Sequence, residues 1–84
     1  MAKKKTPLTP AQALGRAIRE QRLFMDIRTV DLAQTLGVLP NAICKYERGQ
    51  RLTCANVQRI ADAIAISPSQ LVALAEDICR REKA

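Results

Sequence analysis

Signals that begin and end helices recur along this chain, and they constrain its fold more than any other feature. Residues 9–12 (Thr-Pro-Ala-Gln) and 67–70 (Ser-Pro-Ser-Gln) each combine a capping residue, a proline suited to the first helical position and a glutamine that completes a capping box. Gly37 and Gly49 are expected at helix ends, where glycine adopts the left-handed conformation without strain. Between these signals the apolar residues recur with helical spacing. The sequence therefore predicts an all-α fold.

The signals divide the chain into five short helices, which predict a compact five-helix bundle. The expected helices run over residues 10–24, from Arg28 or Thr29 to Leu36, from Pro40 to Gly49, from Thr53 to Ile64 and from Ser67 to Ile78. Phe24 and Tyr46 are the only aromatic residues, so the core is expected to be aliphatic.

One domain over residues 10–79 accounts for all five expected helices. Residues 1–9 carry Lys3, Lys4 and Lys5 without apolar periodicity, which predicts a flexible basic arm. Such a run of lysines most often only improves solubility. The alternative interpretation is an arm that contacts a DNA backbone. Residues 80–84 have no apolar stripe, so a frayed tail is expected there.

The composition excludes several classes of function. Histidine is absent, which removes an imidazole base and histidine-bound metals. Cys44, Cys54 and Cys79 lie ten and twenty-five residues apart, which fits neither a zinc site nor a disulfide framework, so small buried thiols in a reducing cytoplasm are expected. Neither a glycine-rich phosphate loop nor an apolar run of roughly 18 residues is present. We predict a cytoplasmic binding domain that is not an enzyme and uses no cofactor, metal or membrane.

The positive charge is unevenly distributed, and this favours nucleic acid as a partner. The formal net charge is +6. Residues 10–59 hold eight basic and four acidic residues, whereas residues 60–84 hold three basic and four acidic residues. The distribution favours DNA binding at one end of the domain and a protein contact at the other.

The most informative segment is residues 32–49. Ala33 is small where a second helix must cross closely, and Gly37 permits the turn between the two helices. Val38 and Ile43 are expected to bury that turn. Two helices fixed in this way present the outer face of the second as a ridge that fits a DNA major groove.

This segment resembles the helix-turn-helix family of phage repressors and Cro proteins, also called the xenobiotic-response-element family. The matching residues are Leu32, Ala33, Leu36, Gly37, Val38, Ile43, Tyr46, Glu47 and Gly49, together with Arg19-Glu20-Gln21-Arg22, Ile60, Ala61, Ala63, Ile64, Ser67 and Leu71. The resemblance covers residues 11–75. It implies a lambda-repressor-like bundle that binds double-stranded DNA as a sequence-specific transcriptional regulator, a homodimer on a two-fold operator.

The resemblance also implies roles for individual residues. The outward, base-reading positions fall at Pro40, Asn41, Ala42, Cys44 and Lys45, with Asn41 suited to an adenine edge and Ala42 to a thymine methyl group. Positions that grip the DNA backbone fall at Arg28, Thr29, Tyr46, Arg48, Gln50, Arg51 and Asn56. Glu47 is expected to form a structural ion pair with Arg22.

The position before the third helix departs from the family, which usually has a serine or threonine cap where this chain has Leu39. Glycine is also commoner in the family than Ala65 after the fourth helix.

The last helix is the expected dimer element, because it has more apolar residues than one small core requires. They are Ile66, Leu71, Val72, Leu74 and Ile78. The alternative is that all of them pack inward. A second function also stays open, that of an antitoxin or adaptor whose fifth helix binds a partner protein.

Overall fold

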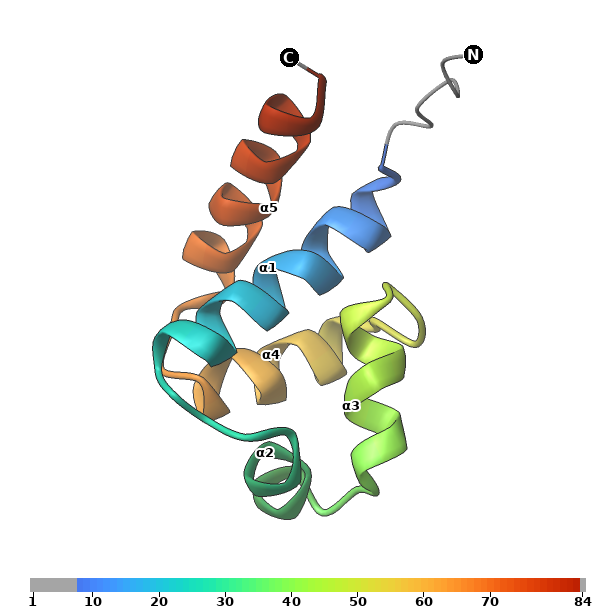
Figure 1. The fold of residues 1–84 in the computed structure, drawn as a ribbon, viewed down its shortest axis with the longest axis vertical. Coiled ribbons are helices and arrows are strands. Elements are labelled where there is room, and N and C mark those ends of the chain that lie inside the picture. Colours follow the sequence, from blue (N-terminus) through green and yellow to red (C-terminus); the bar gives the residue numbers. More distant parts are fainter. Residues whose placement is uncertain (1–7, 84) are drawn as a thin grey trace, which may run out of the picture.

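The structure, a computed structural model, describes residues 8–83. That part of the chain contains five helices and no strand, as Figure 1 shows. The helices are α1 (Pro10–Phe24), α2 (Thr29–Leu36), α3 (Pro40–Glu47), α4 (Cys54–Ala63) and α5 (Pro68–Lys83). The predicted all-α five-helix fold is thus confirmed. The lysines of the expected basic arm, Lys3, Lys4 and Lys5, lie outside the described residues.

Side chains cap the starts of α1, α4 and α5. Thr9 Oγ1 accepts a hydrogen bond from the Gln12 amide at 3.1 Å, and the Gln12 side chain accepts one from the Thr9 amide at 3.0 Å. The same reciprocal pair joins Ser67 and Gln70. Thr53 Oγ1 accepts from the Asn56 amide at 3.2 Å at the start of α4. These bonds explain why sequence signals alone located three of the five helix starts.

The core is aliphatic and lies between α1, α5 and the three shorter helices. Its fully buried large side chains are Ile18, Leu32, Ile43, Ile60, Ile64, Leu71 and Ile78. α1 packs most extensively against α5 and also contacts α3, whereas α2 contacts α3 and α4. Figure 1 shows α2 and α3 at one end of the molecule, away from the last turns of α5.

The crossing of α1 and α3 brings two backbones into direct contact at Gly15. A Cβ atom on Gly15 would lie 2.6–2.7 Å from the Tyr46 and Glu47 carbonyl oxygens and the Gly49 amide nitrogen. Gly49 (φ 89°) is equally close to the backbone of Ala11 and Gln12. Only glycine allows this approach. The two glycines therefore set the position of α3 relative to α1.

α5 extends further than the sequence predicted. A frayed tail was expected from residue 80, but the helix continues to Lys83. Arg81 Nη2 lies 3.3 Å from Glu20 Oε1 on α1, a contact between distant segments that the missing apolar stripe could not reveal. At 16 residues α5 is the longest described helix. Within the described range, none of the helices combines the length and apolar character needed to cross a membrane.

Candidate nucleic-acid interface

The second and third helices form a compact pair whose turn is held by backbone hydrogen bonds. Gly37 (φ 70°) ends α2 in the left-handed conformation. The Val38 amide then donates to the Ala33 carbonyl at 2.9 Å, which satisfies one of the free carbonyls at the helix end. Leu39 has extended backbone angles and leads directly into α3. The turn therefore fixes where α3 begins.

α3 is buried on one side and exposed on the other. Ile43 and Tyr46 face the core at 0% and 8% exposure. Four of the five predicted base-reading residues are exposed: Pro40, Asn41, Cys44 and Lys45. The fifth, Ala42, is half-buried and packs against the core cluster. Its side chain is therefore less accessible than those of the other four, and its role as a base reader stays a prediction.

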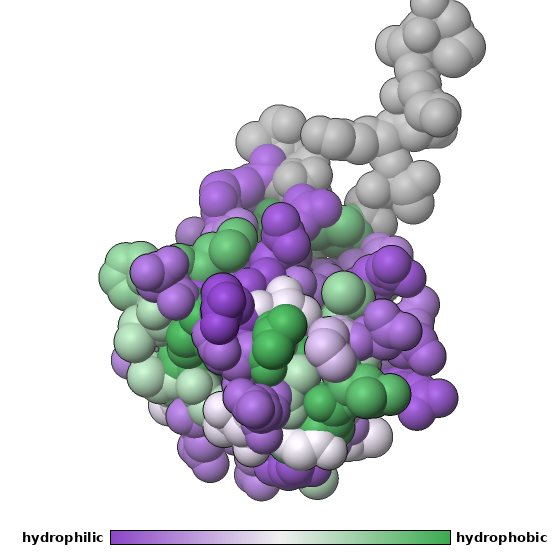
Figure 2. All heavy atoms as spheres, turned by 60° about the horizontal axis from the view of Figure 1, so that its bottom comes forward, coloured by the Kyte–Doolittle hydropathy of each residue, from purple (hydrophilic) through white to green (hydrophobic). Residues whose placement is uncertain are grey.

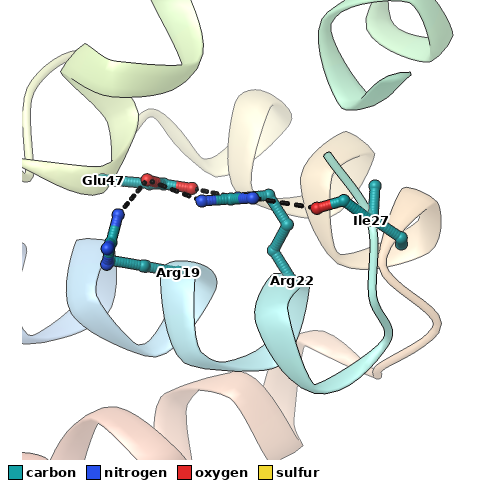
Figure 3. Close-up of polar contacts among 4 residues, drawn as sticks. All are labelled: Arg19, Arg22, Ile27 and Glu47. Atoms are coloured by element: carbon teal, nitrogen blue, oxygen red, sulfur yellow. Dashed lines mark hydrogen bonds and ion pairs between the residues drawn. The ribbon is translucent and has the colours of Figure 1, made fainter. Parts of the chain in front are cut away.

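An ion-pair network joins α3 to α1, and Figure 3 shows its four residues. Arg22 Nε donates to Glu47 Oε2 at 2.6 Å, and Arg22 Nη1 donates to the Ile27 carbonyl at 2.8 Å. Arg19 Nη1 lies 3.6 Å from Glu47 Oε1 and is more exposed. The structure thus contains the predicted pair of Arg22 and Glu47. Because both side chains are less than a tenth exposed, the pair holds the end of α3 against α1.

Arg28, which was predicted to contact the DNA backbone, already has an acidic partner. Its Nε donates to Asp31 Oδ2 at 3.1 Å and its Nη2 donates to Asp31 Oδ1 at 3.3 Å. This hydrogen bonding lowers the pKa of Asp31 below its usual range and raises the pKa of Arg28. Arg28 occupies the cap position of α2 without a side-chain capping bond. Thr29, the next predicted backbone contact, is half-buried.

The remaining predicted backbone contacts lie after α3 and around the start of α4. Arg48, Gln50 and Arg51 are exposed. Arg51 has a φ of 58°, an unusual conformation for a residue with a side chain. Asn56 Nδ2 donates to the Arg51 carbonyl at 2.9 Å. Asn56 therefore holds this strained turn, a role that was not predicted for it.

Tyr46 is more buried, and the three cysteines are more exposed, than the sequence predicted. Tyr46, predicted to contact the DNA backbone, is 8% exposed and belongs to the buried core residues. Cys44 and Cys54 are exposed and Cys79 is partly exposed, so the expectation of buried thiols is wrong. Among the described residues, no group of three or more cysteine or acidic side chains is arranged to hold a metal ion.

The sequence analysis did not identify Arg59 as a residue that supports this surface, and it gave Leu39 no role beyond the missing cap. Arg59 Nη2 donates to the Leu36 carbonyl at 2.6 Å and so ties the end of α2 to α4. Leu39 stands directly before α3 and is 74% exposed. Figure 2, turned to bring the lower end of the molecule forward, shows hydrophobic side chains among hydrophilic ones there.

The apolar residues of α5 are only partly available for a dimer. Leu71 and Ile78, two of the predicted interface residues, are 0% and 2% exposed and belong to the core. They cannot form a contact surface without unfolding α5, so this part of the prediction is wrong. Ile66 and Leu74 are half-buried, and Val72 is 45% exposed.

The comparisons with known proteins agree with this architecture. No protein-family model matches the chain. A curated relative, an uncharacterized HTH-type transcriptional regulator (y4aM) of Sinorhizobium fredii, is 33% identical over 57 residues. The match covers 67% of this chain but only 40% of the relative, so the chain spans less than half of that protein's length.

Two crystal structures of the clp gene regulator ClgR from Corynebacterium glutamicum have the same fold. One has a TM-score of 0.84 and 22% identity, covering 90% of this chain and 99% of the other. The second has a TM-score of 0.87 and 20% identity, covering 93% of this chain and 84% of the other. The chain therefore has the all-helical, helix-turn-helix fold of these solved structures.

Proposed function

We propose that this chain is a sequence-specific DNA-binding transcriptional regulator of the phage repressor and Cro type, acting in the cytoplasm without catalysis. The observation that carries the proposal is the rigid α2–α3 pair, whose outer face exposes Asn41, Cys44 and Lys45 while its inner face is buried. Such a ridge fits the major groove. The names of the curated relative and of the ClgR structures support the same function.

In this proposal α3 reads bases and its surroundings bind phosphates. The Asn41 amide pairs with an adenine edge through two hydrogen bonds, and Lys45 reaches guanine acceptors or a phosphate. Arg48, Gln50 and Arg51 contact the backbone after α3. Arg28 and Thr29 contact it at the start of α2, where the backbone amides favour an anion.

We also propose a homodimer in which α5 pairs with its copy around Val72; the half-buried Leu74 lies on the other side of α5, beside Phe24. A two-fold axis there would place two copies of α3 in successive major grooves, about 34 Å apart. The exposed fraction of Val72 supports this choice, since it is the most exposed residue of the predicted set.

The direct test is a selection of bound sequences from random DNA, followed by substitution of one base reader. Asn41→Ala should weaken binding to the selected site by about 1–3 kcal/mol and leave binding to random DNA nearly unchanged. Arg48→Ala is the matched control, because it should weaken binding to both DNAs alike and reduce the salt dependence. Failure to select any sequence would refute the proposal, and equal losses for Asn41→Ala would refute the role of that residue.

One feature favours a second candidate function, that of an antitoxin or adaptor that binds another protein. A shallow groove between α1 and α5 is lined by Leu14, Val72, Ala75 and Cys79, among others. A helical segment of a partner protein would cover such a groove. This candidate would replace the first if a partner encoded next to this chain bound it stoichiometrically and the chain alone selected no DNA sequence.

A further inference from the structure

Leu39 has neither of the two roles expected for a residue directly before a helix. Its side chain is 74% exposed, so it is not part of the core. It occupies the cap position of α3, but no side-chain hydrogen bond caps that helix. Exposing a leucine to water brings the folded monomer no stability. The side chain is therefore free to contact a binding partner without disturbing the core.

The backbone around Leu39 holds the side chain in a fixed place. The Val38 amide donates to the Ala33 carbonyl before it, and the Leu39 carbonyl accepts from the Ala42 amide at 2.9 Å after it. Pro40 restricts the preceding residue to the extended region, and Leu39 has φ −78° and ψ 153°. Leu39 thus precedes Asn41 by two residues on a backbone that hydrogen bonds hold on both sides, so little backbone entropy is lost when it makes a contact.

The major groove offers one apolar group to such a side chain. Base edges there present hydrogen-bond donors and acceptors, and the exception is the 5-methyl group of thymine. We infer that Leu39 contacts this methyl group and selects thymine at one position of each half-site, an inference that rests on the proposed DNA binding. Ala42, the methyl-contacting residue that the resemblance implied, is half-buried and packs against the core. Leu39 provides the apolar contact in its place.

Deoxyuridine tests this contact, because it lacks the 5-methyl group but keeps the hydrogen-bonding edge of thymine. In the site selected from random DNA, each thymine is replaced in turn by deoxyuridine, and affinity is measured by fluorescence anisotropy. At one position per half-site the wild-type chain should lose affinity about threefold to tenfold, as expected for one buried methyl group. Leu39→Ala should bind thymine and deoxyuridine equally there. Leu23→Ala, which truncates a 53% exposed leucine at the end of α1, should keep the full discrimination.

A second variant separates this contact from any effect on folding. Leu39→Ser supplies the side-chain cap that α3 lacks, so it should unfold at the same or a higher temperature than the wild type while losing the discrimination. Discrimination retained by Leu39→Ala and Leu39→Ser, or no thymine sensitive to demethylation, would overturn the inference and leave the proposed function standing. A chain that selects no DNA sequence would overturn both.

Discussion

Arg22 and Glu47 lie 25 residues apart in the sequence, yet Arg22 Nε approaches Glu47 Oε2 to 2.6 Å in a nearly dry environment. The guanidinium also donates to the Ile27 carbonyl, so one side chain connects α1, α3 and the loop before α2. This is the principal polar link between the helix that carries the candidate base readers and the rest of the domain.

Removing the acidic partner of this pair should strongly destabilise the fold. Glu47→Ala leaves the Arg22 guanidinium buried without its counter-charge, so the free energy of unfolding should fall by about 3 kcal/mol or more. Glu20→Ala breaks the exposed pair with Arg81 and should cost less than about 1 kcal/mol. Urea unfolding followed by circular dichroism measures both. Similar losses for the two variants would contradict the structural role of the buried pair.

A methyl group on Gly15 should separate α1 from α3. Glycine to alanine inside a helix ordinarily stabilises a protein, but here the Cβ atom would lie 2.6–2.7 Å from three backbone atoms. Gly15→Ala should therefore reduce the free energy of unfolding by about 2 kcal/mol or more. Gly37→Ala is the control, since it meets no atom within 4 Å and only its φ of +70° is unfavourable, which costs about 1 kcal/mol. A stabilised Gly15→Ala variant would contradict the close approach.

Glycine at position 65 should stabilise the domain. Ala65 follows α4 with φ 60°, a left-handed conformation that is unfavourable for alanine. Ala65→Gly should raise the free energy of unfolding by about 0.5–1 kcal/mol. The gain is the relieved backbone strain, reduced by the additional conformational entropy that glycine loses on folding. Ala73→Gly, at an exposed position inside α5, should lower it by about 1 kcal/mol. Thermal unfolding of the two variants would show opposite shifts, and shifts of the same sign would count against this account.

Freeing Arg28 from Asp31 should strengthen binding to DNA of any sequence. Asp31→Asn removes the carboxylate that now holds the guanidinium, so one further phosphate contact should steepen the slope of log affinity against log salt by roughly 0.9. Asp77→Asn frees Arg80 from an equivalent pair on α5 and should leave the slope unchanged. Measurements of affinity for random DNA at several salt concentrations give the slopes of the two variants. Equal slopes for Asp31→Asn and the wild type would show that Asp31 does not compete with a phosphate for Arg28.

The same pair has a defined dependence on pH. Because Arg28 lowers the pKa of Asp31, the pair is intact at neutral pH and its contribution to folding stability is lost only as the pH falls through that lowered pKa. The effect of Asp31→Asn on DNA binding should therefore be the same at pH 6 and pH 8.

A charge at position 72 should prevent association of the proposed dimer. Val72→Glu places a carboxylate on the exposed face of α5, where burying it against a second copy would be unfavourable. Val30→Glu, on a 54% exposed residue of α2, should leave the association state unchanged. Sedimentation velocity distinguishes the outcomes. A wild-type chain that is monomeric at all concentrations, or a Val72→Glu chain that still dimerises, would rule out this interface.

Local signals were sufficient to predict the helices. Thr9, Thr53 and Ser67 cap the helices they were expected to cap, and Gly37 ends α2 in the left-handed conformation. Each of these interactions joins residues a few positions apart, so their spacing in the sequence is enough to recognise them.

Longer-range features were not predictable in the same way. Helical spacing identified Leu71 and Ile78 as apolar positions of α5, but it could not tell which apolar residues the other helices would cover. From the sequence alone, Gly15 is only an unfavourable residue inside a helix. Its role becomes visible when the structure places the backbone of α3 against it. The way α3 meets the core leaves Ala42 half-buried, although it was predicted to face outward, whereas Leu39 before the helix is 74% exposed.

The hydrogen bond from Arg59 to the Leu36 carbonyl has a consequence for how the domain opens. The last turn of α2 is completed by a side chain of α4, and Gln21 of α1 likewise donates to the Ile64 carbonyl at the end of α4. The ends of α2 and α4 are thus each completed by a side chain from another helix. Loss of α4 would leave the Leu36 carbonyl without this partner, so the amide protons of α2 and α4 should exchange with solvent as one cooperative unit. A peptide of the α2–α3 pair alone would lack this bond.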